Sequence, residues 1–323
     1  MTSRRIFLSA VAGALALASL ARAQPARRIP TVGFLTLGGV DSLAQFKDAM
    51  RNFGYVEGRD LVIERRSSEG TVAVLPALAA ELVRLNVDVI YATGPAAVKA
   101  AHDATTRIPI VALDLETDPV ASGLVRSLGR PGGNVTGLFL DQPALAGKWL
   151  ELLTEILPGR RRVVALWDVA TGAPQLAAAR AAAQRFGVEL RTLEFATRDE
   201  LVDKLRRAPD GGTQAVMMLT SPILSVNSAL IAEWTLQNRM PAISSFRAFA
   251  ESGGLLSYGP DLVAFRRISA AYVDKILKGA NVAELPVQQP TLFQLVVNQK
   301  TAKSLGIAIP QSVLLRADEV IPS

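Results

Sequence analysis

IPIVALDLETDPVASGLVRSLGRPGGNVTG, residues 108–137, is the stretch that predicts how this chain folds. It begins with a short apolar strand, residues 108–113, followed by the acidic residues Asp114, Glu116 and Asp118. A helix of two to three turns and a Gly/Pro loop are expected next. A strand whose polar tip leads into a helix places side chains and free backbone N–H groups at the carboxyl edge of a sheet, where open α/β folds bind small ligands. The stretch therefore predicts a ligand-binding cleft and gives little sign of catalytic machinery.

Composition narrows the function further. With 323 residues, half of them hydrophobic, the chain is long enough for two lobes. The absence of cysteine excludes disulfides, thiolate nucleophiles and thiolate metal sites, and a single histidine excludes a multi-histidine metal site. The sequence contains no G-x-S-x-G elbow, no phosphate-binding G-x-x-x-x-G-K-[ST] loop and no dinucleotide fingerprint. We therefore expect no enzyme: no catalytic residue, no cofactor and no metal.

Residues 1–23 have the features of a signal peptide. Ser3-Arg4-Arg5-Ile6-Phe7-Leu8 is a twin-arginine pattern, an uncharged run follows, and Ala21-Arg22-Ala23 is a small-residue cleavage signal. The pattern predicts export to the periplasm by the twin-arginine or the Sec route. Because no cysteine follows the cleavage site, a lipid anchor is not expected.

The positive charge of the chain does not indicate nucleic-acid binding. Removal of residues 1–23 takes away Arg4, Arg5 and Arg22 and no acid, so the net charge falls from +6 to +3. The remaining basic residues are dispersed near helix ends and loops, where solvent and helix dipoles accommodate them. No basic stripe interleaved with aromatic residues is present.

The chain after residue 27 alternates between apolar strands and helices. Strands are predicted at 28–37, 60–66, 87–93, 107–113 and 134–140, with helices between the first four of them. Short connections in this order predict a parallel sheet. The pattern then restarts with a helix at 142–157 and strands at 162–167, 188–195, 214–219 and 240–244. Two similar α/β units in one chain predict two lobes with a cleft between them.

Three long blocks of the chain resemble a known family. They are the opening stretch at 108–137, residues 253–280 (GGLLSYGPDLVAFRRISAAYVDKILKGA), and residues 285–321 (LPVQQPTLFQLVVNQKTAKSLGIAIPQSVLLRADEVI). They resemble the periplasmic substrate-binding proteins of ABC transporters, in the group with tryptophan- and phenylalanine-binding members. The resemblance implies a type I periplasmic-binding-protein fold: two Rossmann-like lobes with parallel sheets, joined by a three-crossover hinge. We expect the first lobe at 28–139 plus 247–281 and the second at 140–246 plus 282–323.

In the first lobe, two strand tips are candidate ligand contacts. Proline at the first helical position in Gly94-Pro95 leaves the following amides, beginning at Ala96, free to point into the cleft beside Thr93. A helix N-terminus of this kind attracts a carboxylate. Gly38-Gly39 forms a similar turn. For either turn, the alternative interpretation is an ordinary strand-to-helix connection without a ligand.

The acidic turn after residue 113 offers two interpretations. Its D-x-E-x-D spacing is similar to a calcium loop, but Pro119 and Val125 stand where that loop needs Gly and Glu, so metal binding is rejected. Asp118 before Pro119 is a plausible N-cap, whereas Asp114 at the strand tip can pair with a ligand ammonium. Thr117 lies between them and is included among the ligand-binding candidates.

In the second lobe the equivalent strand tips carry Asp168 and Ser221. Asp168 indicates a cationic group on the ligand, with plain capping as the alternative. Phe246 and Tyr258 lie near the expected hinge, where a ring can stack on a ligand or pack in the core.

Together these features predict a monomeric exported receptor that closes on a small amino-acid-like or aromatic acid ligand. The resemblance implies delivery to an ABC permease with a cytoplasmic ATPase, with only peripheral contact to that membrane complex. A periplasmic sensor feeding a signalling receptor is the alternative, and a periplasmic hydrolase or isomerase a third.

Overall fold

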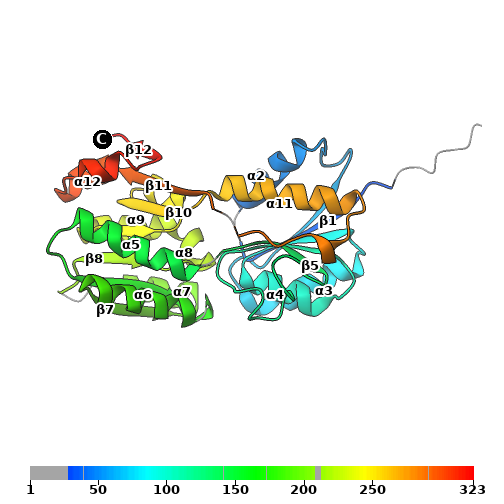
Figure 1. The fold of residues 1–323 in the computed structure, drawn as a ribbon, viewed down its shortest axis with the longest axis horizontal. Helices are drawn as coiled ribbons and strands as arrows, with labels where there is room; N and C mark the ends of the chain where they lie inside the picture. Colours follow the sequence, from blue (N-terminus) through cyan, green and yellow to red (C-terminus); the bar gives the residue numbers. More distant parts are fainter. Residues whose placement is uncertain (1–27, 39, 141, 172, 208–211, 290) are drawn as a thin grey trace, which may run out of the picture.

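The computed structural model describes residues 28–323, except 39, 141, 172, 208–211 and 290, and these residues form two α/β lobes side by side (Figure 1). The predicted signal peptide at 1–23 lies outside the described residues. Among the described residues, no helix has the length and apolar character to cross a bilayer.

The first lobe is built on a five-stranded parallel sheet, as described residues define it, in the order β2-β1-β3-β4-β5. Its elements are β1 (Thr31–Thr36), α2 (Val40–Arg51), β2 (Val62–Ser67), η1 (Val72–Val74), α3 (Leu75–Arg84), β3 (Val89–Thr93), α4 (Pro95–Ala104), β4 (Ile110–Asp114), β5 (Val135–Phe139), α11 (Leu262–Leu277) and η3 (Val282–Glu284).

Alternate side chains of each strand enter different cores. Val32 and Phe34 of β1 pack on the α2/α11 face, with Phe34 and Phe46 at 5.7 Å between ring centroids, whereas Leu35 packs on the α3/α4 face. Because both faces are covered, β1, β3, β4 and β5 are almost entirely buried, as is typical of a parallel sheet, whereas the edge strand β2 is half-buried.

The second lobe is built on a sheet of seven described strands in the order β12-β11-β10-β9-β8-β6-β7. Its elements are α5 (Gln142–Ile156), β6 (Arg162–Asp168), η2 (Val169–Thr171), α6 (Ala173–Phe186), β7 (Glu189–Phe195), α7 (Arg198–Leu205), β8 (Ala215–Met218), α8 (Pro222–Val226), α9 (Ser228–Gln237), β9 (Ala242–Ser244), α10 (Arg247–Glu251), β10 (Leu256–Pro260), β11 (Phe293–Asn298), α12 (Gln299–Leu305), α13 (Gln311–Leu314) and β12 (Glu319–Ile321). Only the β10–β11 pair among them is antiparallel.

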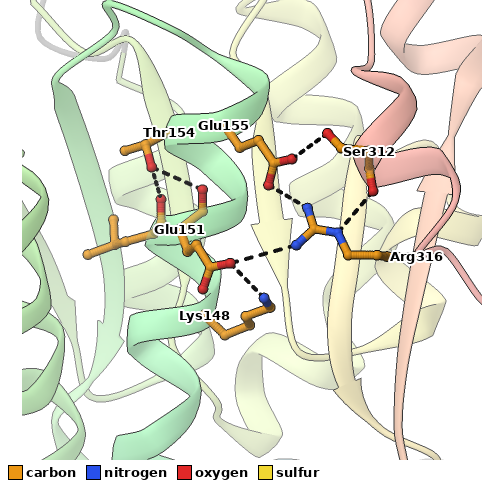
Figure 2. A network of polar contacts seen from close by, with 7 residues as sticks. Lys148, Glu151, Thr154, Glu155, Ser312 and Arg316 are labelled. Carbon is orange, nitrogen blue, oxygen red and sulfur yellow. Dashed lines mark hydrogen bonds and ion pairs between the residues drawn. The ribbon is translucent and has the colours of Figure 1, made fainter.

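A polar network fastens the C-terminal segment to this lobe (Figure 2). The Arg316 guanidinium pairs with Glu155 and, at 3.7 Å, with Glu151 of α5. The Ser312 hydroxyl of α13 donates to the other Glu155 oxygen at 2.6 Å. These two hydrogen-bond donors lower the pKa of Glu155, the Ser312 hydroxyl contributing most. Residues more than 150 positions apart are thereby joined on the surface of the second lobe.

Over its described residues, the chain passes between the lobes three times: after β5, after β10, and between Gln288 and β11. Gln288 belongs to the first lobe because its amide donates to the Gly137 carbonyl at 2.9 Å and its carbonyl accepts from Phe139 at 3.0 Å. The two-lobe fold with a three-crossover hinge is confirmed.

Two details differ from the sequence predictions. Residues 247–260 were expected in the first lobe, but β10 pairs with β9 and β11 and therefore belongs to the second sheet. Residues 282–288 were expected in the second lobe, but they lie along β5; the hydroxyl of Thr136, for example, donates to the Leu285 carbonyl at 2.7 Å. Strand pairing, which a single sequence does not show, sets both boundaries.

The helix predicted after Asp118 is also wrong. Residues 119–124 form successive turns, and Gly123 has a φ of +77°, which a helix does not accommodate. The segment between Pro119 and the loop that begins at Gly129 is short, and an isolated helix of that length is marginal without packing on a core.

Candidate functional site

The carboxyl ends of strands from the two sheets meet at a cleft between the lobes. β1, β3 and β4 end in Thr36, Thr93 and Asp114, and β6 ends in Asp168. Two adjoining cavities occupy this cleft and are lined from both lobes. This is the edge at which open α/β sheets bind ligands.

The larger cavity has a volume of about 550 Å³ and is mainly apolar. Its floor in the first lobe is the start of α4 and of α3, and its second-lobe wall includes Asp168 and Ile223. The apolar side chains include Leu37, Leu75, Pro76, Ala97, Ala100 and Leu124. Lys99, His102 and Asp103 stand along one side of α4. A volume of this size fits a small organic molecule.

The smaller cavity has a volume of about 110 Å³, and its lining includes the polar side chains of Ser42, Glu116 and Arg266. It shares Leu37, Thr93, Gly94 and Pro222 with the larger cavity. A Cβ built on Gly94 would stand only 3.4 Å from Cγ of Pro222, so the lobes approach each other closely at this boundary.

The N-terminus of α4 opens onto the larger cavity. Its N-cap Gly94 provides no side-chain cap, and the first backbone hydrogen bond of the helix runs from the Val98 amide to the Gly94 carbonyl at 3.0 Å. The amides of Ala96 and Ala97, which both line the cavity, are left for another acceptor. Gly94 has φ +84° and ψ +157°, a backbone conformation reserved for glycine. An anion placed here would meet two N–H groups and the positive end of the helix dipole.

The hydroxyl of Thr93, expected to help bind a carboxylate, is already engaged. It donates to the Thr36 hydroxyl at 2.9 Å, which in turn donates to the Gly38 carbonyl at 3.0 Å. Thr93 therefore holds the strand tips together and offers the cavity lone pairs rather than its proton.

Asp168 is the acidic side chain that the second lobe presents to the larger cavity. It is 2% exposed, and both its oxygens accept hydrogen bonds: Oδ1 from the Ala170 amide at 2.9 Å and Oδ2 from the Ser221 hydroxyl at 2.6 Å. Burial raises the pKa of Asp168, and the Ser221 hydrogen bond opposes that rise. The carboxylate is thus rigidly held at the cavity wall.

Asp114 and Glu116 form a second acidic group on the first-lobe side. Asp114 is fully buried, and its Oδ1 accepts the amides of Glu116 at 3.0 Å and Thr117 at 3.1 Å. Oδ2 of Asp114 and Oε2 of Glu116 are buried without a hydrogen-bond donor among the described residues. Burial raises the pKa of both carboxyls, and the nearby charges of Asp114 and Asp168 raise that of Glu116 further.

Most of the residues expected from the sequence line the cleft. Thr93 and Gly94 border both cavities; Pro95, Ala96, Thr117 and Asp168 border the larger one, and Gly38 and Phe246 the smaller one. Asp114 and Ser221 lie directly behind this lining, where each holds a lining residue in place. Gly39 lies outside the described residues.

Two expected residues are placed elsewhere. Asp118 is exposed, and its Oδ1 caps the following turn through the amides of Val120 and Ala121. Tyr258 stacks on Phe293 with ring centroids 5.8 Å apart, and its carbonyl accepts from the Trp149 indole at 2.6 Å. Neither residue borders the two cavities, so the capping and packing alternatives account for their positions.

Sequence reasoning missed several cavity residues. Glu116 lies two positions past a strand tip, which is a signal that could have found it. Pro222, Ser225 and Arg266 had no such signal, because only the packing of α8 and α11 brings them to the cleft. Within the described part of the chain, no group of three or more His, Cys, Asp or Glu side chains is arranged to hold a metal ion.

Two α/β lobes, three connections and a cavity at the facing strand tips define a ligand-binding protein of the type I periplasmic fold. The model of the family described as ABC transporter substrate binding protein matches residues 39–321, and the chain belongs to that family. By this membership it is a solute-binding protein.

Known relatives share the fold over most of their length. A tyrosine-binding protein of Clostridioides difficile is 25% identical over 268 residues, 81% of this chain and 75% of the relative. The structure of an ABC domain in complex with L-Trp from Streptococcus pneumonia has a TM-score of 0.80 and 24% identity, covering 90% of this chain and 99% of the other. A conserved domain protein from Vibrio cholerae gives a TM-score of 0.80 with 25% identity, covering 91% and 100%.

Proposed function

We propose that this protein is the exported receptor of an ABC importer and that it binds a small amino-acid-like ligand in the cleft between its lobes. Closure of the two lobes around the ligand would precede its delivery to the permease. The proposal depends above all on one observation: the uncapped N-terminus of α4 and the carboxylate of Asp168 border the same mainly apolar cavity.

That arrangement matches the three parts of an amino acid. The free amides of Ala96 and Ala97 would bind its carboxylate. Asp168 would attract its ammonium group, and Asp114 and Glu116 near the other cavity would add to this attraction, because a neighbouring cation stabilises a buried carboxylate. The apolar walls of the 550 Å³ cavity would receive the side chain.

The relatives support an amino-acid ligand. One is a tyrosine-binding protein and another was crystallised with L-Trp. Because each shares only about a quarter of its residues with this chain, the particular amino acid must be determined by measurement.

Export and delivery are the remaining parts of the proposal. The twin-arginine pattern, the A-x-A signal and the family membership support a periplasmic protein that works with a permease and its ATPase.

A thermal-shift screen of the purified protein against L-tryptophan, L-tyrosine, L-phenylalanine, nucleosides and sugars tests the ligand class. A bound ligand stabilises the folded state by RT ln(1 + [L]/Kd), so a true ligand raises Tm in a concentration-dependent way. A rise with sugars or nucleosides alone would contradict the proposal. Loss of cellular uptake of the identified amino acid on deletion of the gene would support delivery to a permease, whereas unchanged uptake with a lost signalling response would favour a sensor.

A further inference from the structure

The Asp114 and Glu116 carboxyls present an unusual electrostatic problem. The Glu116 amide donates to Oδ1 of Asp114 at 3.0 Å, so the two carboxyls leave the same turn after β4, and the charge of Asp114 raises the pKa of Glu116. Each has one oxygen that is buried and has no donor from the described residues. Two ionised carboxylates cannot donate to one another, and a buried charged oxygen without a donor is costly.

The charged groups around the pair do not solve this problem. Asp168, across the cleft, adds a like charge, which contributes to the raised pKa of Glu116. Arg266 of α11 borders the same small cavity, but its guanidinium donates to the Gln45 side chain and, at 3.4 Å, to the Leu262 carbonyl. The charge of Asp168 therefore adds to the conflict between the two carboxyls.

A single proton between the two carboxyls removes the conflict. The protonated carboxyl donates to its neighbour, and the pair then carries one negative charge instead of two, as in other carboxylate pairs that share a buried site. Glu116 is the member that holds the proton, since burial, Asp114 and Asp168 all raise its pKa. Asp114 keeps its charge because two backbone amides donate to its Oδ1.

The position of the pair connects this proton to the ligand. Glu116 borders the small cavity, which joins the large one at Thr93, Gly94 and Pro222. An ammonium group at that junction brings three N–H donors and a positive charge. It can donate to the unpartnered oxygen of Glu116, which borders the small cavity, but only if Glu116 is ionised.

We propose that Asp114 and Glu116 share one proton in the ligand-free protein and that the protonated amine of the ligand replaces it, the proton leaving to solvent. Glu116 is then a specificity-determining residue that selects ligands carrying a protonated amine over neutral or anionic ones. The second half of this inference rests on the proposed function; the shared proton does not.

The shared proton is tested without any ligand. In carbon-13-labelled protein, the side-chain carboxyl signal of Glu116 is assigned by its loss in Glu116→Gln and followed as the pH is raised. We expect Glu116 to titrate well above the ordinary glutamate value of about 4.3. Titration in the ordinary range would overturn the inference.

Proton release is tested by calorimetry with L-tryptophan, L-tyrosine and L-phenylalanine in two buffers of different ionisation enthalpy. The dependence of the observed heat on the buffer gives the number of protons exchanged. The wild-type protein should release up to about one proton per ligand. At pH values below the pKa of the pair, its affinity should therefore rise by up to about tenfold for each unit of pH increase. Glu116→Gln should release none and lose this pH dependence.

Two variants separate the possible outcomes. Asp168→Asn removes the other cleft carboxylate and should bind more weakly while still releasing the proton. Glu284→Gln, an exposed change of the same chemistry, should behave as wild type. Ligand binding with equal proton release in wild type and Glu116→Gln would overturn the inference but not the proposed function. Failure of all three amino acids to bind would contradict the proposed function, and with it the displacement step.

Discussion

The hydroxyl of Ser221 donates to Oδ2 of Asp168 at 2.6 Å while its oxygen accepts the amide of Ile223 at 3.0 Å. This one hydroxyl joins the tip of β6 to the start of α8, the two elements that carry the second-lobe wall of the larger cavity. Asp168 therefore faces the ligand cavity and also helps to build it.

Substitution of Asp168 should separate these two roles. Asp168→Ala leaves the buried Ser221 hydroxyl and the Ala170 amide without their acceptor, which should lower ligand-free stability by about 1–3 kcal/mol. Asp168→Asn keeps the shape and one of the two acceptor oxygens, so it should lose less stability than Asp168→Ala and yet bind at least about tenfold more weakly, because the charge is lost. Denaturant unfolding and calorimetry measure the two effects, and full affinity in Asp168→Asn would assign Asp168 to structure alone.

Gly94 has a backbone conformation that favours glycine, and it also lies at the boundary between the two lobes. Alanine there should lower stability by about 1–3 kcal/mol because the conformation favours glycine alone. It should also weaken binding several-fold, since the added methyl would press on Pro222 of the other lobe. Gly54→Ala is the matched control: Gly54 has φ +87° with open space around it, so it should lose stability without losing affinity. Equal affinity in wild type and Gly94→Ala would contradict the conclusion that the lobes approach each other at Gly94 when the ligand is bound.

The raised pKa of Glu116 predicts how ligand-free stability varies with pH. In the folded state this carboxyl binds its proton more tightly than in the unfolded chain, so the unfolding free energy is highest below the ordinary glutamate pKa and falls as pH rises through the raised pKa. Glu116→Gln cannot ionise and should lack this loss. Its melting temperature relative to wild type should therefore increase from pH 5 to pH 8, which a calorimetric series would show. A constant difference between the two proteins would contradict the assignment.

The network around Arg316 concerns stability and should leave binding unchanged. Arg316→Ala should lower the unfolding free energy by less than about 1 kcal/mol, because partly exposed ion pairs are weak, and added salt should shrink the difference. Above the ordinary glutamate pKa, the lowered pKa of Glu155 contributes to stability, and this contribution is lost as pH falls through the lower pKa of the folded state. The unfolding free energy of the variant should therefore fall less steeply than that of the wild type as the pH is lowered.

The control for this network is Arg206→Ala, which breaks a more exposed pair with Asp203. It should have no measurable effect on unfolding or on its acid dependence. A change in ligand affinity in Arg316→Ala would show that the C-terminal segment influences the cleft, contrary to the expectation from Arg316, Glu151 and Glu155, none of which lines either cavity.

Local pattern predicted most of the elements that build the cleft. The helix expected at residues 142–157 matches α5 to within one residue, and the strand tips at Thr93, Asp114 and Asp168 follow from apolar runs that end in polar residues. Periodicity and turn residues are local properties, so one sequence is enough to find them.

Long-range packing accounts for what could not be predicted. Residues 247–260 were expected in the first lobe, but the pairing of β10 with β9 and with β11, whose partners lie 33 to 41 positions further along the chain, places them in the second. Arg266 enters the small cavity only because α11 returns to the first lobe. The proton-sharing geometry of Asp114 and Glu116 depends on burial, which is a property of the assembled lobes and not of the D-x-E spacing.

Calorimetric titration of the purified protein with L-tryptophan, L-tyrosine and L-phenylalanine, repeated with Asp168→Asn, tests most directly whether the space between the lobes is a solute-binding site. We predict that at least one amino acid binds with a stoichiometry of about one and that the substitution weakens it by about tenfold or more. The absence of binding by all three, or binding that the substitution leaves unchanged, would contradict the account.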